Sequence, residues 1–270
     1  MKFVRWSPWS ALLCPILAVP TAAAAQSDPA PICADRPGKA TGTCTVVPGH
    51  VQLEVGLADW SLQKDSSVRE TSLTIGETVI KFGLTERSNL ALTVTAYTRS
   101  AVRAGATRMS ASGFGDVAVS YKHRITSDDA ALAVALLPTV KIPTAKHDIS
   151  NGKVEGGLLV PISYSVPNSA LSIGATPEAD WVADGDGHGH HAAMVQVVSL
   201  GWAATDRLNL AAELWGQWDW DPAGTTRQYS LDGSMALTLS NDIQLDAGAN
   251  LGLNRNTPDL EVYAGASIRF

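Results

Sequence analysis

The chain ends in LEVYAGASIRF, residues 260–270, a stretch that alternates apolar and polar side chains. Successive side chains of a β-strand point to opposite faces, so this alternation predicts a strand with one apolar wall and one polar wall. The apolar wall consists of Leu260, Val262, Ala264, Ala266, Ile268 and Phe270. A strand of this kind separates an apolar environment from a polar one.

Eleven further segments upstream show the same period of two. Apolar Ile243 and Leu245, for example, alternate with polar Gln244 and Asp246. No segment after residue 25 has 18 consecutive apolar residues, which excludes a bundle of membrane-spanning helices. In residues 71–84 the pattern changes phase around Gly76-Glu77, where we expect a β-bulge.

The connections between these segments differ regularly in length. Short turns are expected at 85–88, 126–129, 167–168, 204–206 and 240–242, and longer polar loops at 61–70, 99–113, 143–155, 183–190, 221–227 and 255–258. A soluble β-sandwich has no reason to sort its loops by length, whereas outer-membrane barrels have short periplasmic turns and longer extracellular loops. The sequence therefore predicts an all-β, up-and-down antiparallel transmembrane barrel of about 12 strands.

The N-terminus has the features of a secretory signal peptide. Lys2 and Arg5 precede an apolar run, and small residues lead to a predicted cleavage after Ala25. We therefore expect a cleaved signal peptide (1–25), a periplasmic N-terminal segment (26–47) and an outer-membrane barrel (48–270).

The other end of the chain carries a second export signal. Ala266, Ile268 and Phe270 form an apolar series with an aromatic last residue, which resembles the signal read by the outer-membrane barrel-assembly machinery. This machinery and outer-membrane lipid are the expected partners, and the outer membrane of a Gram-negative bacterium is the expected location.

Two cysteines, Cys33 and Cys44, remain after cleavage. In an oxidising periplasm this pair predicts a disulfide bond. A metal pair is the alternative, but the usual Cys-x2-Cys spacing is absent. The hairpin closed by the disulfide has a fixed shape, so we also consider that it lies under the barrel lumen as a partial plug.

The polar wall of the predicted barrel carries charges of both signs. The candidate lumen-lining residues are Glu54, Lys122, Arg124, Glu178, Asp180, Glu213, Asp232, Asp246 and Arg269. They either line an open aqueous path or pair into a closed, salt-bridged interior. Glu178 and Asp180, near the outer mouth, are the best candidates for contact with a solute.

The overall charge restricts the partners. Removing residues 1–25 leaves 18 basic against 26 acidic residues. This acidic balance favours cations in an open lumen, and it gives no basic face for nucleic acid. The sequence suggests no cofactor.

The predicted loop from Asp184 to His191 brings carboxylates and imidazoles close together in sequence. Asp184, Asp186, His188, His190 and His191 are weak candidates for a Zn²⁺ or Ca²⁺ site. A glycine-rich loop loses conformational entropy when it is ordered, so an ordinary solvated loop is the alternative that we favour.

A lipid hydrolase is a further alternative. Such an enzyme would need a serine and a histidine close together on the outer wall of the barrel. His123 is on the apolar face but beside a periplasmic turn, and Ser120 on the same strand points the other way. His50 also lies at the periplasmic entry. By strand arithmetic no Ser–His pair forms, so we expect no catalytic residues and no enzyme.

Several motifs resemble those of the "MetA-pathway of phenol degradation" transporter-like family. They are Ile32–Pro37, Gly42–Val46, Pro48–Glu54, Lys81–Thr85, Gly113–Asp116, Leu137–Thr144 and Asp180–Gly187. The resemblance covers residues 31–270 and implies an outer-membrane protein that passes small, in part aromatic, compounds. It implies no catalytic residue and no particular substrate.

From these observations we expect a channel or transporter-like barrel for the passive passage of small solutes. A structural or adhesive barrel with a closed lumen is the alternative, and a lipid hydrolase is a more distant one.

Overall fold

The computed structural model describes residues 30–127 and 130–270 and contains one antiparallel sheet. Its strands are β1 (Val51–Asp65), β2 (Val68–Thr85), β3 (Ser88–Ala104), β4 (Thr107–Gly113), β5 (Val117–Arg124), β6 (Leu132–Ile142), β7 (Glu155–Leu159), β8 (Ile162–Ser165), β9 (Leu171–Ala183), β10 (His190–Ala203), β11 (Leu208–Asp219), β12 (Thr226–Ser240), β13 (Ile243–Gly252) and β14 (Leu260–Arg269). No helix within the described ranges is long and apolar enough to cross a membrane.

The fourteen segments make twelve barrel strands. β4 and β5 both pair with β3 and are separated by a bend at residues 114–116, so they form two parts of one strand. β7 and β8 both pair with β6 and β9, and are separated by an interruption at Val160-Pro161. The predicted twelve-stranded antiparallel barrel is confirmed.

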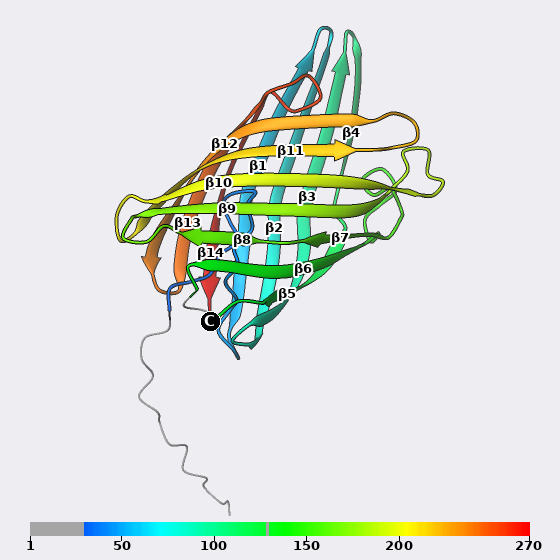
Figure 1. Ribbon diagram of the computed structural model, residues 1–270. Coiled ribbons are helices and arrows are strands. Elements are labelled where there is room, and N and C mark those ends of the chain that lie inside the picture. Colours follow the sequence, from blue (N-terminus) through cyan, green and yellow to red (C-terminus); the bar gives the residue numbers. More distant parts are fainter. Residues whose placement is uncertain (1–29, 128–129) are drawn as a thin grey trace, which may run out of the picture.

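The barrel closes between its first and last strands. β14 pairs with β1, and Phe270 N donates a hydrogen bond of 2.8 Å to Val51 O. Ile268 lies opposite Leu53 in this register, so the apolar series of β14 joins that of β1. The sheet is continuous through the remaining pairs, including β9 with β10 (Figure 1).

Side chains alternate between the lumen and the outside. Glu213 of β11 faces the lumen and is 4% exposed, whereas its neighbour Leu214 faces outward and is 58% exposed. An apolar outer wall suits lipid, and a polar inner wall suits water or polar protein groups.

Two predicted loops are wrong. Residues 61–70 and 99–113 do not form loops, because β1 continues into β2 and β3 into β4, with only residues 66–67 and 105–106 between the strands. Ser66 and Gly105 take the positive φ angles of 48° and 60° that these tight turns need. The polar composition of these stretches hid the strands, because a strand beyond the lipid no longer needs an apolar face.

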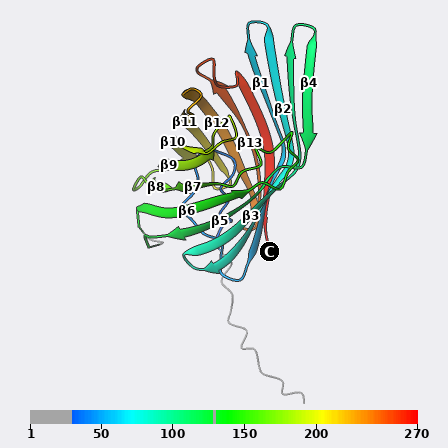
Figure 2. The ribbon, with the colours of Figure 1, turned by 90° about the vertical axis from the view of Figure 1, so that its right-hand side faces the viewer.

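These two hairpins extend further than the rest of the barrel (Figures 1 and 2). The phase change near Gly76 is confirmed, but the expected β-bulge is not on β2, whose register with β1 and β3 is the same on both sides of Gly76. The register shift lies on β1, between Gly56 and Ala58. Gly76 has a φ of 66°, and both Thr74 and Glu77 line the same inner cavity although three positions separate them.

The segment before β1 lies inside the barrel (Figure 1). We call residues 30–47 the N-terminal plug. The predicted signal peptide, with its cleavage site after Ala25, is outside the described residues, as is part of the turn at 126–129.

Candidate functional site

The N-terminal plug crosses the lumen as a hairpin closed by the Cys33–Cys44 disulfide, which confirms the predicted bond. The Cα atoms of the two cysteines are 5.9 Å apart, and Ile32 and Val46 beside them are buried. The plug therefore has a defined shape before any contact with the barrel wall is counted.

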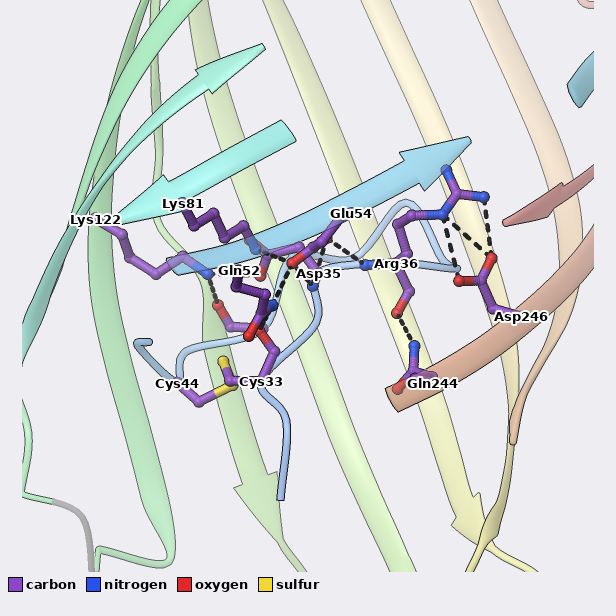
Figure 3. Close-up of polar contacts among 11 residues, drawn as sticks. Cys33, Asp35, Arg36, Cys44, Gln52, Glu54, Lys81, Lys122, Gln244 and Asp246 are labelled. Atoms are coloured by element: carbon purple, nitrogen blue, oxygen red, sulfur yellow. Dashed lines mark hydrogen bonds and ion pairs between the residues drawn. A yellow bond between two sulfur atoms is a disulfide. The ribbon is translucent and has the colours of Figure 1, made fainter. Parts of the chain in front are cut away.

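Glu54 of β1 holds the plug at its centre (Figure 3). Its carboxylate accepts hydrogen bonds from the backbone amides of Asp35, at 3.1 Å, and Arg36, at 3.3 Å. The side chain of Gln52 donates to the same carboxylate at 2.8 Å and to Cys33 O at 2.7 Å. Glu54 is 1% exposed, so these donors take the place of water around a buried charge.

Asp35 of the plug lies between two lysines of the wall (Figure 3). Lys81 of β2 forms ion pairs with both Asp35 and Glu54, and Lys122 of β5 pairs with Asp35 at 2.5 Å. Lys122 also donates to Gly42 O at 2.8 Å, at the other side of the hairpin. Burial favours a raised pKa for the Asp35 carboxyl, but the nearby charges of Lys122 and Lys81 outweigh it and lower this pKa to about 2.

Arg36 extends the contact to β13. Its guanidinium donates two hydrogen bonds to Asp246, with Nε at 3.2 Å and Nη2 at 3.0 Å. Gln244, two positions before Asp246 on the same inner face, donates to Arg36 O at 3.3 Å. This bidentate contact with the Asp246 carboxylate neutralises the Arg36 charge and also fixes the orientation of the Arg36 side chain.

Residues 38–41 reach the opposite wall of the lumen. The amides of Lys39 and Ala40 donate to Glu213 of β11 at 2.7 and 3.2 Å. The Lys39 ammonium donates to Ser230 at 3.0 Å and lies 4.4 Å from the centre of the Trp215 ring. Since a side chain on Gly38 would collide with the Glu213 carboxylate, the plug approaches this wall as closely as a glycine permits.

Cavities lie on both sides of this crossing. One, of about 620 Å³, separates the plug from the short-turn ends of β9–β12. Its wall is formed by small side chains, among them Ser172, Ser199, Ser234 and Ala236. The other, of about 270 Å³, is lined by Lys39 and by Thr257 and Pro258 of the β13–β14 loop.

Glu213 lines the first cavity and Lys39 the second. The contact between these two residues therefore lies between the two cavities.

The inner wall on the long-loop side of the plug is acidic. Glu178 and Asp180 project inward from β9, and Asp59 of β1 lies close to Glu261 of β14. Asp232 forms an ion pair with Lys39 at 3.4 Å. Glu178, Asp180 and Asp232 were predicted from the sequence as lumen residues, whereas Asp59 and Glu261 were not.

Two predicted lumen residues are placed at the short-turn rim instead of at the plug. Arg124 donates to Glu86 O at 2.9 Å, and Arg269 pairs with Asp242 at 2.7 Å. Each arginine joins the end of its own strand, β5 or β14, to a neighbouring short turn. Ile268 and Phe270 face outward and are 37% and 68% exposed, and Ala266 lies on the same face of β14.

In the candidate metal-binding loop from Asp184 to His191, the histidines contact different partners. His191 bonds with Asp184 and Asp219, both at 2.9 Å. His190 bonds with Val154 O and stacks on Trp181. Asp186 accepts a hydrogen bond from the amide of His188. Across the described part of the chain, no group of three or more ligands is arranged to hold a metal ion.

The expectation that strand arithmetic pairs no serine with a histidine is wrong in one case. Ser88 of β3 lies directly opposite His123 of β5. However, the Ser88 hydroxyl shares a hydrogen bond of 2.7 Å with Thr85, and His123 stacks against Tyr121. His50 contacts Pro48 O at 3.2 Å. Among the described residues, no hydrogen bond joins a serine hydroxyl to one of these histidines.

The plug's own binding residues, Asp35, Arg36 and Lys39, and their partner Lys81 were not predicted from the sequence. Lys81 was hidden by the change of phase at Gly76, which obscures the inner face of β2. The charges between the two cysteines were the available signal, because a short constrained hairpin with Asp and Arg is suited to pair with a charged wall.

A family model described as "Putative MetA-pathway of phenol degradation" matches residues 34–270. The chain belongs to this family. The match includes most of the plug as well as the whole barrel, so both are parts of the family's shared sequence. A search of curated proteins found no match.

Solved structures share the fold at low sequence identity. The COG4313 outer membrane channel from Pseudomonas putida F1 superposes with a TM-score of 0.69 at 14% identity, covering 87% of this chain and 99% of that one. The translocator domain of the autotransporter NalP from Neisseria meningitidis gives a TM-score of 0.54 at 13% identity, covering 82% and 88%. At such identities the likeness shows an outer-membrane-type barrel fold.

Proposed function

We propose that this family member is an outer-membrane channel for the passive passage of small molecules, and that the N-terminal plug sets its width. The observation that carries the proposal is the contact between Lys39 and Glu213, which has a cavity on each side. A barrel with a purely structural role has no need of water-accessible space along the small-residue wall.

The acidic inner wall on the long-loop side favours cations over anions. Glu178, Asp180, Asp59 and Glu261 all project into this region, where Lys39 is paired with Glu261 and Asp232. A cleft whose walls carry an excess of one sign concentrates ions of the other sign. The family description names phenol degradation, so small aromatic compounds are the first neutral solutes to test.

Export, cleavage after Ala25 and insertion through the barrel-assembly machinery are parts of the same proposal.

The test is single-channel recording in planar bilayers, followed by liposome swelling with phenol, benzoate and small sugars. We expect small, cation-selective currents, with a lower cation preference in the variant Glu178→Gln/Asp180→Asn. Absence of both current and swelling would favour the alternative of a closed, salt-bridged structural barrel. Release of fatty acid from phospholipid by the pure protein would favour the hydrolase.

A further inference from the structure

A row of cations crosses the outer face of the two protruding hairpins. The strand register places Lys64 opposite Arg69, Arg69 opposite Arg103, and Arg103 opposite Arg108. Residues opposite one another in an antiparallel ladder share a face, so these four side chains stand side by side on β1 to β4. Arg99 lies on the same face of β3, four positions from Arg103. We call these five residues the outer cation row.

The register also decides which way the row faces. Asp59 of β1 faces the lumen cavity beside Arg36, so Trp60, Leu62 and Lys64 face outward. Trp60 pairs with Val262 of β14, which is 40% exposed on the apolar outer wall. The outer cation row therefore continues the lipid-facing side of the barrel and takes no part in the lumen.

Among the described residues no acidic side chain is ion-paired with these cations, although the Asp259 carboxylate accepts a hydrogen bond from the Lys64 backbone amide at 2.9 Å. Within residues 30–127 and 130–270, none of the five forms an ion pair, and all five are exposed. The positions between Arg99 and the rest of the row are Leu62, Thr71, Ala101 and Ser110, which are uncharged. The acidic neighbours Asp65 and Glu70 project from the opposite face.

The row lies at the height of lipid headgroups. Lys64 is four positions beyond Trp60 on β1, about 13 Å along the strand, and Arg69, Arg103 and Arg108 are paired at its level in the sheet. Arg99 is paired through Leu73 at the level of Trp60 itself, so the row begins at this tryptophan and extends beyond it. An outward Trp marks the boundary of the hydrocarbon layer, and the headgroups begin directly above it. The four arginines of the row line a groove of about 460 Å³. This groove faces the headgroup layer.

We propose that the outer cation row binds the phosphate groups of the phosphorylated glycolipid in the outer leaflet, the lipid A part of lipopolysaccharide. Like charges directly opposite one another destabilise a sheet, so four in a row without an anion are unfavourable unless an external anion joins them. Arginine binds phosphate oxygens with two parallel hydrogen bonds, and the row spans about 14 Å, enough for more than one phosphate. This inference depends on the outer-membrane location and not on channel activity.

The experiment compares two triple variants in detergent. Arg69→Gln/Arg103→Gln/Arg108→Gln removes three charges from the row. Lys146→Gln/Lys153→Gln/Arg207→Gln removes the same number elsewhere, at two exposed positions and one half-buried one (Lys153), whose side chains make no hydrogen bond or ion pair among the described residues. Native mass spectrometry measures binding of bis-phosphorylated lipid A and of the same lipid without its phosphates. The heat-dependent shift in gel migration checks that each barrel is folded.

We expect wild type and the control variant to bind bis-phosphorylated lipid A at least about tenfold more tightly than the row variant does. The dephosphorylated lipid should bind all three proteins equally weakly. Equal binding of lipid A by the row and control variants would overturn the proposal, and so would equal binding of the two lipids by wild type. Displacement of lipid A by millimolar inorganic phosphate would identify a free-phosphate site and overturn the lipid assignment. Because conductance is not measured, failure here leaves the proposed channel untouched.

Discussion

The cations inside the barrel and those on its protruding hairpins are arranged in opposite ways. Lys81, Lys122 and Arg36 in the lumen each contact a carboxylate, whereas Arg69 and Arg103 outside contact none among the described residues. The inner cations are buried or half-buried, and a buried charge is stable only when it is paired. The exposed outer cations keep their hydration and can remain unpaired.

This difference separates two uses of charge in one barrel. Inside, the pairs join wall and plug, so the position of the plug depends on them. Outside, the charges are available to a ligand from the membrane. Substitutions should therefore have large effects on stability and conductance inside, and small ones outside.

The largest effect is expected at Glu54. Glu54→Ala removes one of the two carboxylates paired with Lys81 and the acceptor of two plug amides, and breaking a buried ion pair costs about 3–5 kcal/mol. We expect release of the plug and a several-fold rise in single-channel conductance. Glu77→Ala is the matched control, because Glu77 also faces the lumen but makes no hydrogen bond or ion pair to the plug within the described ranges. Equal conductances of the two variants would contradict the account.

A smaller effect is expected at the link between the plug and β13. In a double-mutant cycle of Arg36→Gln and Asp246→Asn, we expect a coupling free energy of about 1–3 kcal/mol in chemical unfolding, since the pair shares two charge-assisted hydrogen bonds. Additive effects of the two substitutions would mean that the contact does not hold the plug.

Acid should weaken the contact between the N-terminal plug and the barrel wall at Asp35. Its carboxyl has a pKa of about 2 in the folded protein, lowered from its ordinary value of 3.8 by the charges of Lys122 and Lys81. A lowered pKa stabilises the fold fully at pH values above the unfolded value, and this contribution is lost as the pH falls toward about 2. We expect the conductance of wild type to rise between about pH 4 and pH 2.

The variant Asp35→Asn separates this residue from the other carboxylates. It should conduct more than wild type at neutral pH and should show a smaller further rise in acid. An acid response identical to that of wild type would assign the effect to other groups.

The smallest effect is expected in the outer cation row. Arg103 stands between Arg69 and Arg108, so Arg103→Gln relieves repulsion between like charges. We expect the free energy of unfolding in lipid-free detergent to rise by no more than about 0.5 kcal/mol. A loss of stability as large as that of Glu54→Ala would remove the contrast between inside and outside.

The sequence predicted the barrel well because lipid imposes a strict rule on its strands. Where the outer face must be apolar, as in residues 260–270 with Leu260 and Ile268, alternation is visible and the strands were found. At residues 61–70 and 99–113 the strands continue beyond the hydrocarbon layer, the alternation disappears, and loops were predicted wrongly.

The site was predictable only in part, for a related reason. Glu54, Glu213 and Asp246 were identified as lumen residues from strand parity, and the disulfide from the cysteine pair. Their partners Asp35, Arg36 and Lys39 lie in a segment without regular structure, where no periodicity shows which way a side chain points. Only the folded chain brings Arg36 to Asp246, 210 positions away.

The most direct test of the central claim is the single-channel conductance of a barrel that lacks residues 31–47, compared with the intact mature protein in the same bilayer. If the N-terminal plug sets the width of the lumen, the shortened barrel will be folded by its gel shift and will conduct several-fold more current. It will also admit solutes that the intact protein excludes from liposomes. Equal conductance and equal solute limits in the two proteins would contradict the claim.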